Sequence, residues 1–240
     1  MSVLEKSAQI IDVLGHAEGP VRLGAVADAV AMPKSSAHRL LGELSRLGIV
    51  RSEGDGEYTL GYRLVRWGAL ADDRFELRAV AEPVMRRLSD DVSESVHLHV
   101  PEGLARVCVA GVPGPHTLRP VIDVGTTRRL GVGAAGKLLL AYADDRVRGR
   151  LVDSTPAPQR SALPTDADLA AMRDQGWARS VGELEPGLSA WAAAVAAPGG
   201  DAVAALTVSG ATTRLPDSRG PEVVARLSAA AAEISALLGS

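Results

Sequence analysis

The chain has little cysteine, few aromatic residues and no long apolar run. Its 240 residues include one cysteine, Cys108, which rules out an intrachain disulfide framework and suits a reducing compartment. Aromatic residues make up 3% of the chain, so we expect a core built mainly from aliphatic side chains. There is no run of 18 or more apolar residues and no signal-peptide pattern at residues 1–6. We therefore expect a cytoplasmic protein that does not contact a membrane.

Residues 21–61 contain the pattern of a winged helix-turn-helix. Apolar residues at helical spacing predict a short helix over residues 23–30. Pro33 ends that helix and starts the next, over residues 33–47, because proline disfavours helix at the preceding residue and suits a first helical turn. One face of the second helix is apolar, including Leu47, so its other face must point outward. That outward face carries Lys34, Ser35, His38, Arg39, Gly42 and Arg46. Several of these are residue types that commonly contact DNA in its grooves.

A hairpin follows the second helix and supplies the wing. Residues 48–51 and 57–60 are typical of strands, and Asp-Gly in the intervening turn, residues 52–56, is a strong hairpin signal. Helix, turn, helix and hairpin in this order predict DNA binding; the alternative is a helix pair with solvated charges. Residues 1–60 hold six Lys and Arg against eight Asp and Glu. We therefore expect phosphate attraction only from a narrow basic stripe, residues 34–51.

The remaining sequence indicates a second, mixed domain. A helix ending near Gly15 precedes the motif, and a helix over residues 62–71 follows it as a linker. Further on, strands are expected at 95–100, 105–110, 189–197 and 202–209, with helices at 77–90, 136–142, 165–176 and from 221. Strands and helices that do not alternate strictly favour an α+β fold. The predicted domains are a winged helix-turn-helix domain at 1–61, a linker helix at 62–76 and a sensor domain at 77–240.

A glycine-rich segment suggests an enzyme as the competing hypothesis. Residues 131–137 satisfy G-x-G-x-x-G and most of a phosphate loop. Leu138, however, replaces the hydroxyl residue that holds magnesium, and Thr126-Thr-Arg-Arg129 stands where a dinucleotide site needs a buried strand. The segment is more typical of a turn at a helix N-terminus, where free N–H groups favour an anion. No cofactor is therefore expected.

Three other groups of residues could carry chemistry. His97 and His99 share one face of a predicted strand, as metal ligands often do, but no further ligand follows at telling spacing, and a partly exposed strand face is the simpler interpretation. Cys108 lies in an apolar strand and is expected to be a small buried hydrophobe. Glu183 and Glu185 lack a nearby histidine partner and are more typical of surface charge than of acid–base catalysis.

Several segments together resemble the IclR-type bacterial transcriptional regulators. They are Pro33-Lys-Ser-Ser-Ala-His-Arg-Leu-Leu41, Tyr58-Thr-Leu-Gly-Tyr-Arg-Leu64, Leu130-Gly-Val-Gly-Ala-Ala-Gly-Lys-Leu-Leu-Leu-Ala141, Gly176-Trp-Ala178, Glu183, Gly187-Leu188 and Ala204-Ala-Leu-Thr-Val-Ser-Gly210. The resemblance spans nearly the whole chain. It implies a GAF-like α+β effector-binding domain, a homodimer or homotetramer with contacts through the first helix and the linker, and a small organic acid or aromatic metabolite as effector.

The resemblance and the residue chemistry together select two sets of site residues. For operator DNA, the candidates are Lys34, Ser35, Ser36, His38 and Arg39 on the second helix, with Arg51 near the wing. For the effector, the resemblance implies Ala134, Ala135, Ser180, Leu188, Ala190, Thr207 and Ser209. Ala190 and Ser180 replace a common Cys and a common acid of the family, so we expect fewer polar anchors and an aliphatic pocket with Trp191 beside it. Ala31 replaces the usual Gly in the turn, which predicts slight strain.

Overall fold

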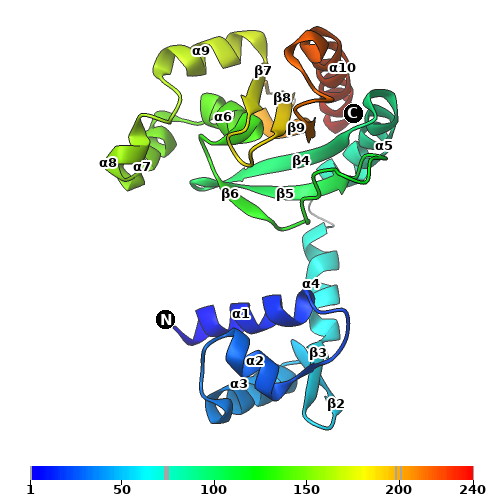
Figure 1. Cartoon of the computed structure of the whole chain (residues 1–240), viewed down its shortest axis with the longest axis vertical. Helices are drawn as coiled ribbons and strands as arrows, with labels where there is room; N and C mark the ends of the chain where they lie inside the picture. Colours follow the sequence, from blue (N-terminus) through cyan, green and yellow to red (C-terminus); the bar gives the residue numbers. More distant parts are fainter. Residues whose placement is uncertain (1, 73–75, 198, 201, 240) are drawn as a thin grey trace. The chain divides into compact units, whose positions relative to one another are not determined.

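The computed structural model describes residues 2–72, 76–197, 199–200 and 202–239, and these fall into two compact units, 1–75 and 76–240 (Figure 1). Residues 73–75, at the end of the predicted linker, and part of the predicted turn at residues 198–201 lie outside the described residues. Within the described part of the chain, no helix has both the length and the apolarity needed to cross a membrane.

The first unit is a winged helix-turn-helix, as predicted. Its elements are α1 (Val3–Gly15), β1 (Val21–Arg22), α2 (Leu23–Ala29), α3 (Lys34–Arg46), β2 (Val50–Gly54), β3 (Glu57–Leu60) and α4 (Tyr62–Asp72). The strands form an antiparallel sheet in the order β1-β3-β2. Strand β1 was not predicted, because two residues carry no periodicity and the strand exists only through pairing with β3. Ile10, Val26 and Leu41 lie at the centre of the core that the helices share.

Two turns of this unit contain left-handed backbone, and the sequence predicted a turn at each place. Between α2 and α3, Ala31 has φ +46°, a left-handed conformation that agrees with the strain expected at this position. At the tip of the wing, Asp55 and Gly56 have φ +50° and +73°, as a two-residue hairpin turn of the primed type requires. Strand β2 runs on to Gly54, so the turn is shorter than predicted.

The second unit is an α+β domain built on one antiparallel sheet. Its elements are α5 (Glu76–Val92), β4 (Ser95–Glu102), β5 (Ala105–Val112), β6 (Thr127–Arg129), α6 (Gly133–Tyr142), α7 (Asp145–Ser154), α8 (Ala157–Arg160), α9 (Asp166–Gln175), β7 (Trp177–Val181), β8 (Leu188–Ala196), β9 (Ala202–Ala211), a 3₁₀ turn (Asp217–Arg219) and α10 (Gly220–Leu238). The strand order is β6-β5-β4-β9-β8-β7, which confirms the predicted fold class. Thr165 and Gly176 cap α9 as expected. Elements α7, α8, β6 and β7 were not predicted.

The two faces of this sheet are covered by different helices. Helices α5 and α10 pack on one face, while α6, backed by α9, packs on the other (Figure 1). Successive strand residues point to opposite faces, so Trp191 and Leu206 enter the α5–α10 core, whereas Ala190 and Ala205 face α6. Alanines on the second face allow α6 to lie close to the strands.

Candidate functional site

Helix α3 presents the predicted polar face to solvent. Ala37, Leu40, Leu41 and Leu44 are buried against α1, α2 and the wing, and this fixes which side of the helix remains exposed. All five predicted DNA-contacting residues on α3 are exposed: Lys34, Ser35, Ser36, His38 and Arg39. Leu47 was placed on the apolar face but is 39% exposed, because the helix ends at Arg46 and Leu47 is its cap. Helix α3 can therefore enter a groove without disturbing its packing.

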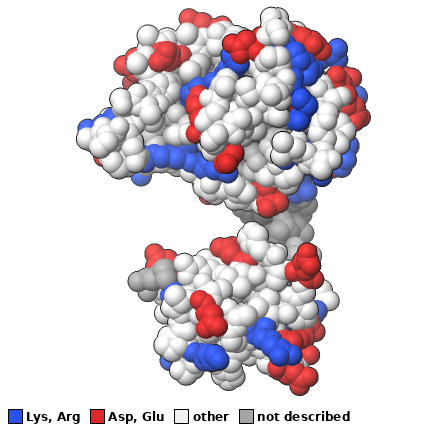
Figure 2. Space-filling view, in the orientation of Figure 1, with Lys and Arg blue, Asp and Glu red and all other residues white. Residues whose placement is uncertain are grey.

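The wing residue Arg51 is already engaged by its own neighbours. It is exposed, and its Nε donates to Glu53 Oε1 at 2.8 Å while its guanidinium carbon lies 4.9 Å from the centre of the Tyr62 ring. The Glu53 hydrogen bond raises the pKa of Arg51, so the residue stays charged. Figure 2 shows basic and acidic side chains interspersed on the visible face of this unit. This agrees with a narrow basic stripe rather than a broad basic surface.

In the second unit, six of the seven predicted effector residues line one cavity, which we call the α6 cavity. Its volume is about 190 Å³, the space of roughly six water molecules at ~30 Å³ each. The predicted residues in its wall are Ala134, Ala135, Leu188, Ala190, Thr207 and Ser209. They come from the start of α6 and from strands β8 and β9. Such a volume suits a small organic molecule.

Neither Ser180 nor Trp191 lines this cavity. Ser180 is buried and pairs with Ala190, but it lies on the edge strand β7 and is not part of the wall. The prediction that Trp191 lies beside the pocket is wrong, because residue 191 follows residue 190 in a strand and must point to the opposite face. Trp191 is 1% exposed in the α5–α10 core, with Arg179 stacked 4.9 Å from its ring centre.

The N-terminus of α6 is occupied by a carboxylate of the chain itself. The Gly133 amide donates to Glu183 Oε2 at 3.0 Å, and Lys137 Nζ donates to Glu183 Oε1 at 2.5 Å. Glu183 therefore stands at the place where a phosphate loop would hold phosphate. Its role is to cap the helix, rather than to serve as plain surface charge. The strand before the glycines, β6, is mainly exposed, so it is not the buried strand that a dinucleotide site needs.

His97 and His99 are buried rather than partly exposed, at 2% each, because they lie on β4 on the face of the sheet that α6 covers. Burial, and then the charge of Arg106, lower the pKa of His97 to about 4 and lower that of His99 well below its usual value. Both rings are therefore neutral at pH 7. Among the described residues, no three His, Cys, Asp or Glu side chains come together as metal ligands would.

The sequence interpretation missed Arg106, which also lines the α6 cavity. Arg106 is 3% exposed, and its Nη1 donates to His99 Nδ1 at 2.9 Å. A single arginine within the apolar strand 105–110 was the available signal. Cys108, two residues on, is fully buried, and burial raises the pKa of its thiol to about 11, which confirms the small buried hydrophobe.

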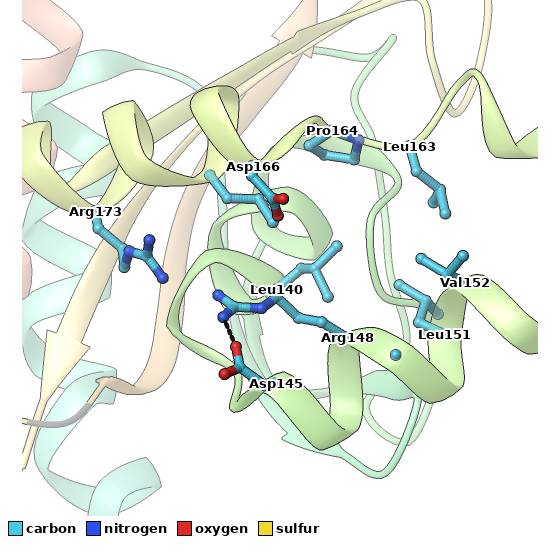
Figure 3. A pocket seen from close by; sticks show the side chains of 11 residues that line it. Leu140, Asp145, Arg148, Leu151, Val152, Leu163, Pro164, Asp166 and Arg173 are labelled. Carbon is cyan, nitrogen blue, oxygen red and sulfur yellow. Dashed lines mark hydrogen bonds and ion pairs between the residues drawn. The ribbon is translucent and has the colours of Figure 1, made fainter.

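A second cavity, of about 440 Å³, lies between α6, α7 and α9, and we call it the α9 cavity. Figure 3 shows Leu151, Val152 and Leu163 at one end and charged side chains at the other, where Arg148 pairs with Asp145. Its other arginine, at position 173, donates to the Ala141 carbonyl at 3.1 Å. The predicted effector residues do not line this cavity, and of its two arginines Arg148 pairs with Asp145 while Arg173 donates to a backbone carbonyl.

Comparison with known proteins gives the same two-part architecture. Residues 3–54 match the IclR helix-turn-helix domain model, and residues 70–236 match the model of the bacterial transcriptional regulator IclR C-terminal domain. The chain is 32% identical to the HTH-type transcriptional regulator KdgR of Escherichia coli, over 96% of this chain and 90% of the relative. It is 30% identical to the glycerol operon regulatory protein of Streptomyces coelicolor, over 99% and 96% of the two chains.

A solved structure of similar fold contains a small aromatic acid. It is an IclR homologue from Microbacterium hydrocarbonoxydans complexed with 4-hydroxybenzoate, with a TM-score of 0.80 and 24% identity, over 99% of both chains. The family model of the C-terminal domain covers more than half of this chain, and the helix-turn-helix model covers the unit that carries α3. The chain belongs to the IclR family of bacterial transcriptional regulators, and it is a DNA-binding regulator rather than an enzyme.

Proposed function

We propose that this regulator binds operator DNA through α3 and responds to a small organic acid in the α6 cavity. The observation that carries the DNA-binding part is the division of α3 into a fully packed apolar face and an exposed face with Lys34, His38 and Arg39. On this model α3 enters the major groove, the serines at its start contact phosphate or base edges, and Arg51 contacts the backbone from the wing. Arg51 must then break its hydrogen bond to Glu53 and donate to a DNA phosphate instead.

The sensor part of the proposal rests on the α6 cavity. Six residues that the family resemblance selects converge there, and Thr207 and Ser209 supply hydroxyl groups. The 4-hydroxybenzoate bound to the Microbacterium homologue supports an organic acid of one ring or smaller as effector. Binding regulates DNA affinity only if the effector prefers one arrangement of the protein over another.

We propose further that the regulator works as a homodimer or homotetramer. Several large apolar side chains on α1 and α4 are exposed in the single chain: Val3, Leu4, Tyr62, Val65, Trp67 and Leu70. Their exposed fractions range from 46% for Trp67 to 82% for Leu4. Covering these residues with a second copy would remove an apolar surface that monomeric proteins rarely expose. A dimer would also present two copies of α3 to two half-sites.

The DNA-binding proposal can be tested by changing Arg39→Ala and titrating the DNA upstream of the protein's own gene in a gel-shift experiment. We expect affinity to fall by roughly 1–3 kcal/mol if Arg39 reads a base edge, with the fold unchanged. Arg86→Ala, which removes an exposed arginine of α5 in the other unit, is the matched control and should bind as the wild type does. Equal affinity of the two variants would remove Arg39 from the interface.

A further inference from the structure

Arg106 is a buried cation that lacks a counter-charge. Its exposed fraction is 3%, and among the described residues no carboxylate lies within ion-pair distance of its guanidinium. Charged arginines are rarely buried unless they are paired with an acid. Glu185 also lines the cavity, but it is exposed and does not pair with Arg106. The charge of Arg106 therefore remains open to neutralisation by a molecule inside the cavity.

Hydrogen bonding within the cavity is also incomplete. Nη1 of Arg106 donates to His99, but Nε is buried and has no acceptor within the described structure. The Oγ atom of Ser209, in the wall of the same cavity, is likewise buried without a partner. A buried donor left without an acceptor costs roughly 1–3 kcal/mol, and more when it is charged. Two unsatisfied groups therefore belong to residues that line one small cavity, where a bound ligand could satisfy both.

The electrostatic surroundings favour an anion. Burial, followed by the nearby charge of Arg128, lowers the pKa of Arg106 to about 10, so Arg106 is still positively charged at pH 7. His99 accepts a hydrogen bond from Arg106 and is neutral, so it does not offset this charge. The inner wall of the cavity therefore carries a net positive charge.

The position of Arg106 makes it a better candidate for binding an anion than the N-terminus of α6. A Cβ atom built on Gly136 would lie 3.5 Å from Arg106 Nε, and one built on Gly133 would lie 3.7 Å from Nη2, so the guanidinium lies directly against the start of α6. The Gly133 amide is already bonded to Glu183. The donor left without an acceptor at this place is thus Nε of Arg106 rather than the first amide of α6.

We propose that the α6 cavity takes its ligand as a carboxylate anion held by the guanidinium of Arg106, with Ser209 as a second hydrogen-bonding partner, and that Arg106 decides the selection of acids over neutral analogues. This inference rests on the proposed effector function of the cavity. It assigns the anchor to a residue on β5, outside the set that family resemblance selects. It also identifies why an acid is preferred even though the remaining walls are largely aliphatic.

The test uses the full chain labelled with ¹⁵N and two pairs of minimal probes, formate with formamide and acetate with acetamide. Each pair has similar size but differs in charge, and each member is small enough for the cavity. We expect the Arg106 Nε signal, and the backbone amide signals of Thr207 and Ser209, to shift saturably with the two carboxylates and not with the two amides. An unchanged Nε signal, or equal shifts with acid and amide, would overturn the proposal.

Variants provide the second readout. In Arg106→Gln, carboxylate affinity measured at the Thr207 and Ser209 amides should fall roughly 10- to 100-fold, as expected for loss of a charged hydrogen-bonding group. Arg106→Lys should lose less, because it keeps the charge but not the planar fork, and it serves where the glutamine variant fails to fold. Arg148→Gln, in the wall of the α9 cavity, is the matched control and should behave as the wild type. Full carboxylate affinity in both Arg106 variants would contradict the proposal.

Gel-shift titrations on the same samples separate this proposal from the regulator function. Operator binding by the wild type together with no carboxylate shift at Arg106 would remove the anion anchor and leave the DNA-binding proposal intact. Carboxylate shifts at Arg106 without a carboxylate effect on operator affinity would leave the anchor intact and remove its regulatory role.

Discussion

The two faces of the six-stranded sheet differ in what they pack and in what they leave open. The face under α5 and α10 is filled by large apolar side chains such as Trp191, Leu98 and Leu206, each at most 1% exposed. The face under α6 is built from alanines near its centre and from polar residues around the cavity, including His99 and Arg106. The same strands supply both faces. Both faces therefore bury apolar side chains, but the α6 face also keeps a ligand-sized space.

The largest expected effect on stability comes from truncating a large side chain on the face under α5 and α10. Trp191→Ala should lower the free energy of unfolding by roughly 3–5 kcal/mol, because it removes a fully buried aromatic side chain and leaves a cavity. Thr207→Val, on the opposite face, should cost only about 1 kcal/mol, since it mainly removes the hydrogen bond from Thr207 Oγ1 to the His97 carbonyl. Urea unfolding followed by circular dichroism measures both. Equal losses would contradict the division between the faces.

The next effect should appear on acidification and arises on the α6 face. The pKa of His97 is about 4 in the folded protein against an ordinary 6.5, so the unfolded chain binds more protons between these values. Stability should therefore be complete above pH 6.5 and fall as pH drops towards 4, by on the order of 3 kcal/mol from this residue. His97→Gln removes this titration and should make the pH profile less steep in unfolding experiments across this range, while His99, whose pKa is also lowered, keeps its own contribution. An identical acid response in wild type and variant would exclude His97 as its source.

A further effect on stability is expected from placing a large side chain in the α6 cavity. Ala135→Trp places a large side chain in the α6 cavity and should cost roughly 1–3 kcal/mol through overpacking. It should also abolish any thermal stabilisation that small organic acids give the wild type, while operator binding persists. Ala157→Trp, at an exposed position of α8, is the control and should keep the ligand response. Undiminished stabilisation of Ala135→Trp would place the effector elsewhere.

The winged helix could be predicted because its signals are local. Pro33 marks the start of α3, Asp55-Gly56 marks the wing, and the apolar spacing of α3 separates its two faces; each depends on backbone geometry within a few residues. The missed strands depend on distant partners. The two residues of β1 are a strand only beside β3, and the mainly exposed β6 only beside β5.

The candidate sites likewise depend in part on contacts between residues that are distant in the sequence. Six of the predicted effector residues line one cavity, but Ser180 does not, because which strand lies at the edge of a sheet follows from its strand order. The position of Trp191 could have been predicted, because side chains alternate between the two faces along β8 and Ala190 was already assigned to the pocket. The burial of His97 and His99 could not have been deduced, since it depends on how α6 covers the sheet.

The sequence by itself determined the DNA-binding unit, the α+β class and the positions of most helices and strands, because periodicity, proline, glycine and capping residues act on their immediate neighbours. Only the tertiary structure decided which residues share a cavity. Arg106, Ser209 and Ala135 come from three separate elements, and they meet only because the strand order brings β5 and β9 to either side of β4 and α6 packs across them. The free donors on Arg106 likewise follow from the fold: burial removed water from the guanidinium, and the described chain brings it no carboxylate in exchange.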